Sequence, residues 1–437
     1  MVTSFRNKLI KNSGIAFIGR VLTLAFTLAL TVLVTRSVSV EQSGLFFFIT
    51  SAALFSSIIG RFGLEVSALR FISENIEGNR SLAYGIYWFC FKKVVKQSII
   101  SIPILVISLE LSNFTYDVKI LLPALAFSIL LTWQYYIFEA SRKILGIGHS
   151  VIFGGLLLYL LTTIFVLIYK TFFLVQLSTV FTLASISLLI SLTFSFYLTK
   201  KSQEIQSVTP ANIIDAPLKH SIVKAASPIG IKAILAFVLT NGDIWIMSFF
   251  LSPEEVAIYG AASRLVFLVS FTLQIVNIVV SPEISKKSND KSKEFESFLK
   301  ASAFPPFVVS MLLAFLFIFF GEFILGLLFG EAFSEGYVIL SILTVGKVVN
   351  AYTGSCGYVL LMKGFERYAL YSVAVVGSFT ILLSIVLLNY WGAKGVAIAF
   401  ALGLSMQQLS ILYFCRHKVG INTVASLREF KKLIGVH

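Results

Sequence analysis

Charged residues are scarce in this sequence, where Asp, Glu, Lys and Arg make up 13% of 437 residues and hydrophobic residues make up 57%. A soluble globular protein has about 25% charged residues, so this composition excludes one and predicts an integral membrane protein. Cysteine is also rare: Cys90, Cys356 and Cys415 are too few and too widely spaced for a disulfide framework or a metal site.

Signatures of enzymes are missing as well. The four histidines (His149, His220, His417 and His437) lie in stretches predicted to be loops, and the sequence contains no HExxH, no P-loop and no Ser/His/Asp grouping. We therefore predict that the protein is not an enzyme and uses no cofactor or metal. Without an ATP site, transport has to be driven by an ion gradient, the membrane potential or the substrate gradient.

Long apolar runs are what the sequence has in abundance. A helix needs about 20 apolar residues to cross the roughly 30 Å hydrocarbon core of a bilayer. The third run is preceded by aromatic residues within 84–91, next to Lys92 and Lys93, a pattern typical of a membrane interface. The runs predict an all-α protein with twelve transmembrane helices, at residues 14–35, 45–69, 94–111, 118–138, 150–169, 174–198, 228–250, 256–280, 302–320, 336–361, 367–388 and 395–414.

Basic residues are unevenly distributed between the two sides of these spans. Of the 35 lysines and arginines, 26 fall before the first span and in every second loop after it, four fall in the other loops, and five lie within spans. Because cytoplasmic loops carry the excess of positive charge, we expect both termini in the cytoplasm. The basic start (Arg6, Lys8 and Lys11) leads into a full-length span, so we expect no cleaved signal peptide.

A weak internal repeat divides the chain. The segment SVEQSGLF from Ser39 aligns with SPEEVAIY from Ser252, an offset of 213 residues. Each segment precedes the second span of a six-span set, so we expect two six-helix halves, related as parallel repeats around a central cavity. The predicted division is an N-terminal half, a cytoplasmic linker, a C-terminal half and a basic cytoplasmic tail, at residues 1–198, 199–227, 228–414 and 415–437.

Arg61 stands near the middle of the second predicted span, four residues before Glu65. At 100° per residue, Thr50, Ser57 and Glu65 fall within about 40° of Arg61, so the polar groups share one stripe. An arginine at the bilayer centre costs about 2.5 to 3.5 kcal/mol, so we expect this stripe to face a bundle interior or a water-filled cavity. Two interpretations stay open: a pair that holds two helices together, or a substrate-facing cation whose charge Glu65 tempers.

Four further cations and one further carboxylate lie within the spans. Arg20 and Lys232 are close enough to the cytoplasmic side to snorkel to the interface, whereas Arg264 is deeper and Lys347 deepest. Five cations against Glu65 and Asp243 leave a net charge of about +3, which predicts an interior that attracts an anion. The predicted substrate-binding residues are Arg20, Arg61, Lys232, Arg264, Lys347, Asn350 and Tyr358.

Asp243 and Glu65 are the predicted coupling residues. A buried carboxylate can bind a proton or Na⁺ as a cavity changes its exposure. For Asp243 a structural ion pair stays open as the alternative, with Lys232 or with a cation from another helix.

The segments TRSVSVEQSGLFFF and RFGLEVSALRFISE carry a family resemblance. They resemble the N-terminal signature of Wzx-like polysaccharide flippases in the multidrug/oligosaccharidyl-lipid/polysaccharide exporter superfamily, although Ser37, Val38 and Ser39 replace the usual residues and Ser43 stands where Tyr is common. The resemblance implies transport of a polyprenyl-diphosphate-linked oligosaccharide, such as a repeat unit of O-antigen, lipopolysaccharide or capsule, across the inner membrane of a bacterium. Its implied partners are this lipid-linked oligosaccharide, membrane lipids and the glycan polymerase machinery.

Two other functions fit a twelve-span protein. A multidrug antiporter of the same superfamily that exports cationic drugs is expected to have an acidic cavity, the opposite of the one predicted. A polysaccharide polymerase or ligase is expected to need a large external loop, whereas the longest external connection, residues 321–335, is mostly apolar. The basic segments 286–300 and 416–432 are interpreted as anchors on anionic lipid, so we expect no nucleic-acid partner.

Overall fold

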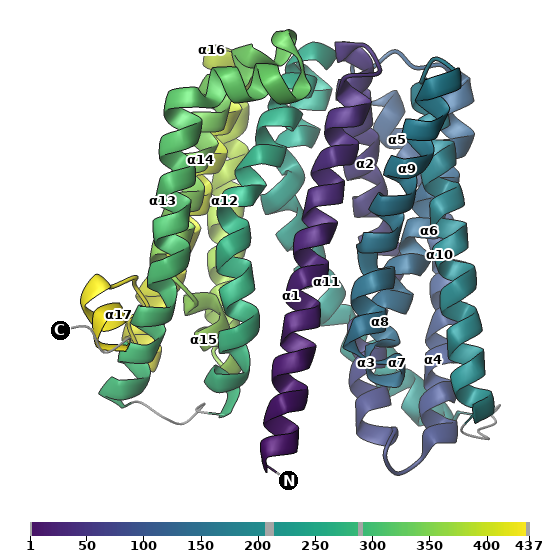
Figure 1. The fold of residues 1–437 in the computed structure, drawn as a ribbon, viewed down its shortest axis with the longest axis vertical. Coiled ribbons are helices and arrows are strands. Elements are labelled where there is room, and N and C mark those ends of the chain that lie inside the picture. The colour runs from purple at the N-terminus through teal and green to yellow at the C-terminus, as the bar shows by residue number, and fades with distance from the viewer. Residues whose placement is uncertain (1, 206–213, 287–291, 434–437) are drawn as a thin grey trace. The chain divides into compact units, whose positions relative to one another are not determined.

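A computed structural model describes residues 2–205, 214–286 and 292–433 of the chain (Figure 1). Every regular element in these ranges is a helix, which confirms the predicted all-α membrane fold. The described part packs as two compact units, Met1–Phe237 and Val238–His437. The boundary falls inside one long helix, α11 (Ala216–Phe250), which therefore contributes to both units.

The first unit contains the helices that precede α11 and the first part of α11 itself. In chain order its other elements are α1 (Val2–Thr35), α2 (Val40–Arg61), α3 (Leu64–Asn75), α4 (Arg80–Gln97), η1 (Ser98–Ile100), α5 (Ser101–Glu110), η2 (Val118–Ile120), α6 (Leu121–Ala140), α7 (Arg142–Leu145), α8 (Ile147–Val151), the π-helix η3 (Ile152–Leu156), α9 (Leu157–Phe172) and α10 (Leu177–Ile205).

The second unit follows Val238 in α11. Its other elements are α12 (Pro253–Lys286), α13 (Lys293–Phe329), η4 (Glu331–Gly336), α14 (Tyr337–Thr353), α15 (Cys356–Met362), α16 (Glu366–Phe414), the π-helix η5 (Cys415–Val419) and α17 (Leu427–Leu433). The 49-residue α16 is two helices joined at Gly392, where φ is 53° and ψ is −136°.

Ten helical stretches in the described residues are long and apolar enough to cross a membrane. Two more helical legs of membrane-spanning length do not meet that criterion as single helices. One is the run of α4, η1 and α5, whose pieces are each too short or too polar, and the other arises because α16 turns back at Gly392. The twelve predicted spans therefore each correspond to a helical leg, and the third leg begins at Arg80, well before the predicted residue 94.

The aromatic residues ahead of the third predicted span are not an interfacial belt. Tyr84 and Tyr87 lie within α4 and are fully buried. Tyr136 of α6 donates a hydrogen bond to the Tyr87 carbonyl over 2.7 Å, and Trp88 stacks on Phe196 of α10. These contacts bind α4 to its neighbours in the first unit, so the interpretation as a belt was wrong for these residues.

Helix starts in the two units follow the repeat. α2 and α12 begin at Val40 and Pro253, and α4 and α13 begin at Arg80 and Lys293, so both pairs are 213 residues apart. The second leg differs between the units, because α12 is continuous whereas α2 ends at Arg61 and α3 begins at Leu64. The predicted helix over 45–69 is therefore two helices.

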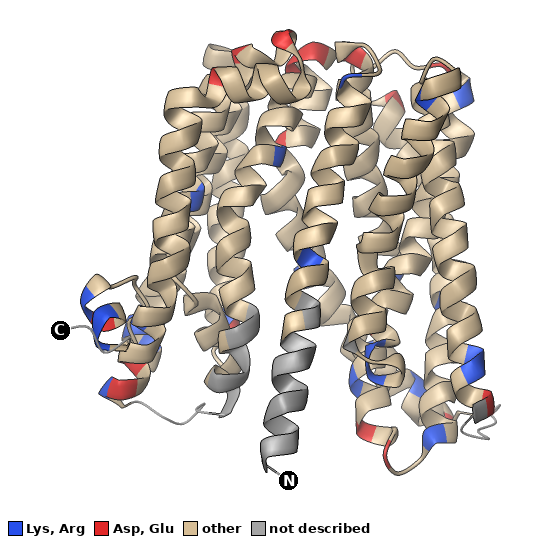
Figure 2. Cartoon of the chain, viewed as in Figure 1, with Lys and Arg blue, Asp and Glu red and all other residues tan. Residues whose placement is uncertain are grey.

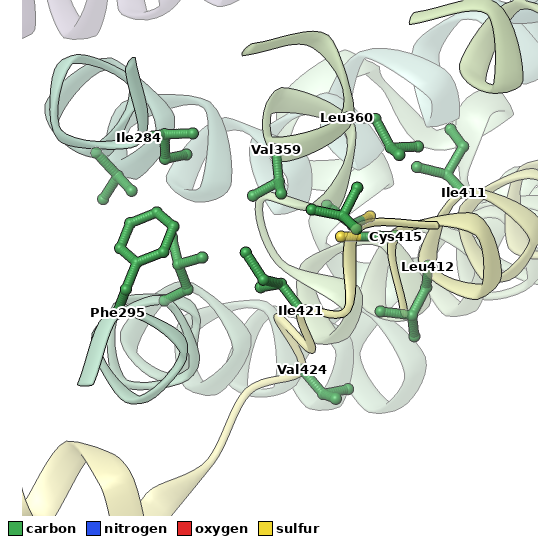
Figure 3. Packing of buried hydrophobic residues seen from close by; sticks show 13 residues of the cluster. Ile284, Phe295, Val359, Leu360, Ile411, Leu412, Cys415, Ile421 and Val424 are labelled. Atoms are coloured by element: carbon green, nitrogen blue, oxygen red, sulfur yellow. The ribbon is translucent and has the colours of Figure 1, made fainter. Parts of the chain in front are cut away.

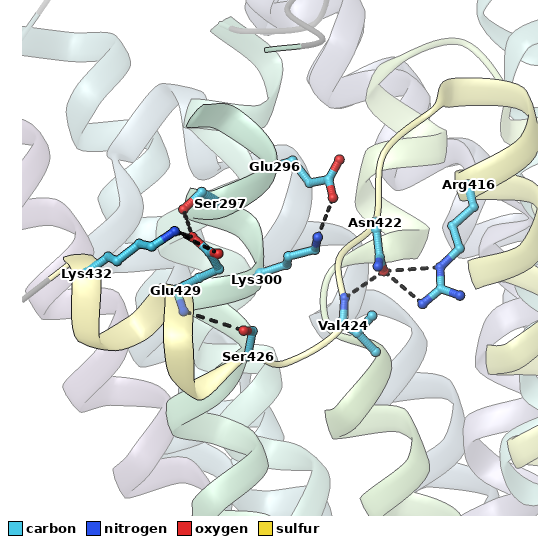
Figure 4. A network of polar contacts seen from close by, with 9 residues as sticks. All are labelled: Glu296, Ser297, Lys300, Arg416, Asn422, Val424, Ser426, Glu429 and Lys432. Atoms are coloured by element: carbon cyan, nitrogen blue, oxygen red, sulfur yellow. Dashed lines mark hydrogen bonds and ion pairs between the residues drawn. The ribbon is translucent and has the colours of Figure 1, made fainter. Parts of the chain in front are cut away.

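The residues after α16 pack against the second unit. Ile421 and Val424 join a buried cluster with Phe295 of α13, Val359 of α15 and Cys415 (Figure 3). We call residues 420–433 the C-terminal arm. This arm lies along α13, which it contacts through polar groups at α17 (Figure 4).

The arm also covers a helix break. α14 ends before Gly354, whose φ is 67°, and the carbonyl groups exposed there accept hydrogen bonds from the arm. The Thr423 hydroxyl donates to the Thr353 carbonyl over 2.6 Å, and the Ala425 amide donates to the Tyr352 carbonyl over 2.9 Å. Unpaired carbonyls at a helix end are costly when buried, so these two bonds stabilise the break.

Candidate functional site

The second leg breaks beside Arg61. α2 ends at Arg61, Phe62 adopts a left-handed conformation with φ 43° and ψ 42°, and Gly63 has φ 80°. Phe62 is the only described residue other than glycine with a positive φ. Such strain persists where the surroundings enforce it, and it concentrates at functional sites.

Across this break Arg61 and Glu65 form a direct ion pair. Arg61 Nη1 lies 2.8 Å from Glu65 Oε1, and each side chain is 11% exposed. Arg61 Nε donates to the Ser57 carbonyl and hydroxyl, and the guanidinium carbon lies 4.8 Å from the centre of the Tyr135 ring. This pairing was one of two interpretations that the sequence left open, and the shared stripe with Ser57 was predicted, whereas Tyr135 comes from another leg and had no sequence signal.

The break places each charge where a helix end favours it. Arg61 closes α2, where the partial negative charge of the helix C-terminus stabilises a cation, and Glu65 lies in the first turn of α3, where a carboxylate is stabilised. The second carboxylate oxygen, Glu65 Oε2, is buried and has no hydrogen-bond partner among the described residues. That oxygen is positioned to take a proton or a water molecule.

Two glycines hold the break against α11 within the first unit. A Cβ atom on Gly63 would lie 2.4 Å from the Ala226 carbonyl oxygen, and one on Gly230 would lie 2.8 Å from the Phe62 carbonyl. Only residues without side chains allow the two backbones to approach this closely. The Ser67 hydroxyl donates to the Ile222 carbonyl over 2.7 Å, so α3 is tied to the same helix.

The second unit contains a different buried charge site around Asp243 of α11. Asp243 is 8% exposed, and its Oδ2 accepts a 2.8 Å hydrogen bond from the Tyr259 hydroxyl of α12. Its Oδ1 accepts from the Ile244 amide over 2.9 Å. Lys347 of α14 is near enough for its charge to interact with Asp243, although the two groups form no ion pair within 4 Å in the described structure.

The structure brings together some of the predicted residues and separates others. Arg61 pairs with Glu65, whereas Lys347 is near enough to Asp243 for their charges to interact without a direct contact. Lys232 and Asp243 both belong to α11, and no ion pair joins them in the described structure.

The remaining predicted residues have different environments. Arg20 and Lys232 are exposed side chains, whereas Arg264 and Asn350 are half-buried. Tyr358 of α15 is 40% exposed and follows the break at Gly354. Their assignment to substrate binding stays a prediction. Within the described ranges no group of three or more His, Cys, Asp or Glu side chains is placed to hold a metal ion.

Comparison with known proteins places this architecture among membrane exporters. No family model matches the chain. A curated relative, the "Probable low-salt glycan biosynthesis flippase Agl15" of Haloferax volcanii, is 24% identical over 211 residues, which cover 45% of each chain. The match therefore spans less than half the length of that relative.

Solved structures match over almost the whole chain. The lipid II flippase MurJ in an inward closed conformation has a TM-score of 0.64 at 16% identity, over 97% of this chain and 90% of that one. The multidrug transporter DinF-BH of the MATE family has a TM-score of 0.67 at 18% identity, over 94% and 95% of the two chains. An inward-facing MATE transporter has a TM-score of 0.68 at 14% identity, over 91% and 94%.

These matches confirm the resemblance that the N-terminal motif indicates, to the superfamily that includes flippases and MATE transporters. At such identities the solved structures show the fold alone. By their names these proteins are flippases and transporters rather than enzymes, in agreement with the missing enzyme signatures of the sequence.

Proposed function

We propose that this protein is a flippase that carries a polyprenyl-diphosphate-linked oligosaccharide across the cytoplasmic membrane of a bacterium. The observation that carries the proposal is the buried Arg61 at the break of the second leg, together with the sequence match to a glycan biosynthesis flippase. Membrane crossing is the barrier such a substrate faces, since each unpaired hydroxyl in hydrocarbon costs several kcal/mol and a diphosphate costs far more.

Arg61 has the chemistry to bind the diphosphate. Its Nε and Nη1 groups are bonded within the protein, whereas no residue in the described part accepts a hydrogen bond from Nη2. The planar guanidinium therefore keeps N–H groups for a phosphate oxygen while Ser57 and Tyr135 fix its orientation. Arg20, Lys232, Arg264 and Lys347 would supply further positive charge for the diphosphate, with Asn350 and Tyr358 bonding to sugar hydroxyls.

Glu65 is the proposed coupling residue of this site. When a phosphate draws Arg61 toward itself, Glu65 loses part of its partner's charge, and its unpartnered Oε2 is then placed to accept a proton. Asp243 is the second candidate, because Tyr259 satisfies one oxygen and Lys347 does not neutralise it by contact. The halves would then rock to expose the substrate on the far side.

Translocation in proteoliposomes tests the proposal. The probe is a fluorescent polyprenyl diphosphate bearing one N-acetylhexosamine, and the readout is its protection from an impermeant quencher. Arg61→Ala is expected to lower the rate by about tenfold or more, because a charge-assisted bidentate contact is lost, and Arg61→Lys is expected to restore part of it.

Arg70→Ala is the matched control, because Arg70 pairs with Glu74 at the same spacing on the same leg but is 68% exposed. Equal rates in wild type, Arg61→Ala and Arg70→Ala would refute the role of Arg61. A wild-type rate equal to that of protein-free liposomes would refute the flippase itself.

Export of cationic drugs is the second candidate function, favoured by the fold match to MATE transporters. The net positive charge of the spans argues against it, since cations repel a cationic drug. Uptake of a cationic dye by the same proteoliposomes under an imposed proton or Na⁺ gradient decides between the two.

The orientation of the protein in the membrane is inferred from its basic residues. In each unit Lys and Arg gather toward one end of the helices, and the middle carries few charges (Figure 2). We propose that the basic end is cytoplasmic, with both termini there and a glycan polymerase as the partner on the opposite side. A cysteine placed at Ser252 in a cysteine-free background should then react with an impermeant thiol reagent from outside the cell.

A further inference from the structure

A small cavity lies at the end of the second unit opposite to the C-terminal arm. Its volume is about 230 Å³, and it is lined by Glu255, Ile258, Glu335, Ile339, Trp391 and Lys394, together with Ala393. Pockets for drug-sized ligands begin at about 300 Å³, so this space suits a group the size of one sugar ring.

The turn inside α16 builds the cavity wall. At Gly392 the backbone leaves the helix with φ 53°, so Trp391 before the turn and Lys394 after it reach the same space. The Glu255 carboxylate lies over this turn, since a Cβ on Gly392 would be 3.5 Å from Glu255 Oε1. Ile258 and Ile339 supply the apolar lining between α12 and α14.

The polar groups of the cavity have hydrogen-bonding capacity that is left for a ligand. Glu255 Oε2 accepts only a weak 3.3 Å bond from the Ser252 amide, which caps the start of α12. Neither Glu335 nor Lys394 has a hydrogen bond or ion pair in the described part of the chain, and the Trp391 ring is 58% exposed. One aromatic face, two acceptors and one donor thus converge on the same small volume.

The charge at this end selects the kind of ligand. The helix ends here carry the carboxylates of Glu254, Glu255, Glu331 and Glu335, and Lys394 is the single basic residue among residues 250–255, 330–337 and 389–395. Such a field repels a phosphate, in contrast to the net positive charge of the spans. A neutral or amino-bearing pyranose fits: its C–H face packs on the indole, carboxylates accept from its hydroxyls, and Lys394 donates to a ring or carbonyl oxygen.

We infer that this cavity binds one sugar residue of the translocated oligosaccharide at the external end of the second unit. The inference rests on the proposed flippase function and adds to it a site for the glycan, separate from the cations that would bind the diphosphate. By attracting sugar and repelling phosphate, the site would favour release of the lipid-linked head group outward.

Saturation-transfer NMR with the full-length protein in phosphatidylglycerol nanodiscs tests this site. The probes are methyl glycosides of a hexose and of an N-acetylhexosamine, with mannitol as the acyclic polyol for comparison. Ring protons of at least one glycoside are expected to receive saturation, and Trp391→Ala is expected to reduce the transfer about fivefold through loss of the aromatic contact. Glu335→Gln is expected to reduce it about twofold through loss of a charged acceptor.

Matched controls come from the same surface. Tyr390→Ala removes a neighbouring aromatic side chain that is 77% exposed and does not line the cavity, and Glu331→Gln removes a neighbouring carboxylate outside it. Both are expected to leave the transfer unchanged. Equal transfer in Trp391→Ala and wild type, or transfer to mannitol as strong as to the glycosides, would overturn the inference.

Two further arms separate the alternatives. Glycerophosphoethanolamine is tested as a second probe. Saturation transfer to it that free glycosides do not reduce would show a lipid head-group site instead. Arg61→Ala is expected to lower the translocation rate by about tenfold or more while leaving saturation transfer intact. Loss of glycoside binding with normal flipping therefore counts against the sugar site alone, and glycoside binding without flipping counts against the proposed function alone.

Discussion

In the first unit Arg61 and Glu65 touch across a helix break, whereas in the second unit Asp243 sits inside the continuous α11 and bonds to the neutral Tyr259, with Lys347 beyond contact distance. A contact pair is neutral as a whole until a ligand draws one member away. Charges that do not touch respond separately to an ion or a substrate. The two repeats therefore differ in one respect. A ligand that binds Arg61 has to break an ion pair, whereas a ligand that binds at Asp243 does not.

The largest expected difference between the sites is in the coupling free energy of their two charged residues, measured by double-mutant cycles. Glu65→Ala leaves the Arg61 guanidinium buried without its partner, which is expected to cost about 3 kcal/mol of unfolding free energy, and adding Arg61→Met should recover most of it. The cycle of Asp243→Asn with Lys347→Met should give a coupling below about 1 kcal/mol. Denaturant unfolding in detergent measures both cycles.

The exposed pair Arg70–Glu74 calibrates these cycles. It has the same four-residue spacing as the Arg61 pair, and both side chains are at least half exposed. Its coupling is expected at about 0.3 to 0.5 kcal/mol. A coupling of that size between Arg61 and Glu65 would contradict the distinction between the units.

The next effect concerns the backbone break, which only the first unit has in its second leg. Gly63→Ala is expected to cost about 2 to 3 kcal/mol, because a left-handed residue acquires a Cβ that meets the backbone of α11. Gly420→Ala is the control, since Gly420 has φ 77° with nothing within 4 Å of its Cβ position, and should cost about 1 kcal/mol. Equal costs would mean that the close approach to α11 contributes nothing.

A smaller effect is expected from the hydroxyl that satisfies Asp243. Tyr259→Phe removes a buried donor to a carboxylate, which is expected to cost about 1 to 2 kcal/mol. Tyr371→Phe, at a tyrosine of α16 that is 62% exposed, should be neutral in the same thermal unfolding assay. A neutral Tyr259→Phe would show that water or Lys347 replaces the tyrosine, and the second site would then resemble the first.

The smallest effect tests a half-buried carboxylate outside the spans against the two sites within them. The Ser297 hydroxyl, followed by Lys432, lowers the pKa of Glu429 in the C-terminal arm below its ordinary value of 4.5. A lowered pKa in the folded state stabilises the docked arm above pH 4.5, and this stabilisation is lost as the pH falls through the folded pKa. Amide exchange in α17 should accelerate in that acidic window, and Glu429→Gln should abolish the dependence on pH. An unchanged pH profile in Glu429→Gln would contradict this assignment.

The sequence was sufficient to predict the spans, because length and hydropathy decide membrane crossing whatever the packing is. It also predicted that Arg61 and Glu65 share one polar stripe, although the two residues meet across a helix break rather than on one helix. The turn between the last two spans followed from the polar stretch around Gly392.

The break at Phe62 was beyond sequence reasoning. RFGLE reads as uninterrupted helix, and a phenylalanine with positive φ goes against local preference, so packing against α11 has to enforce it. The hydrogen bond from Tyr259 to Asp243 was equally hidden, because the two residues come from different helices. The aromatic residues of α4 misled for a related reason: composition alone does not separate an interface belt from a buried aromatic cluster.

The close backbone approach at Gly63 and Gly230 also limits how this chain can change over generations. Every amino acid that one base change can make from a glycine codon carries a Cβ, and at either position that atom would meet backbone at less than 3 Å. No substitution that one base change produces at Gly63 or Gly230 avoids this clash. Gly78, with nothing within 4 Å of its Cβ position, is free to vary. In a mutational scan Gly63 and Gly230 should therefore both be intolerant of substitution, although they lie 167 residues apart in the sequence.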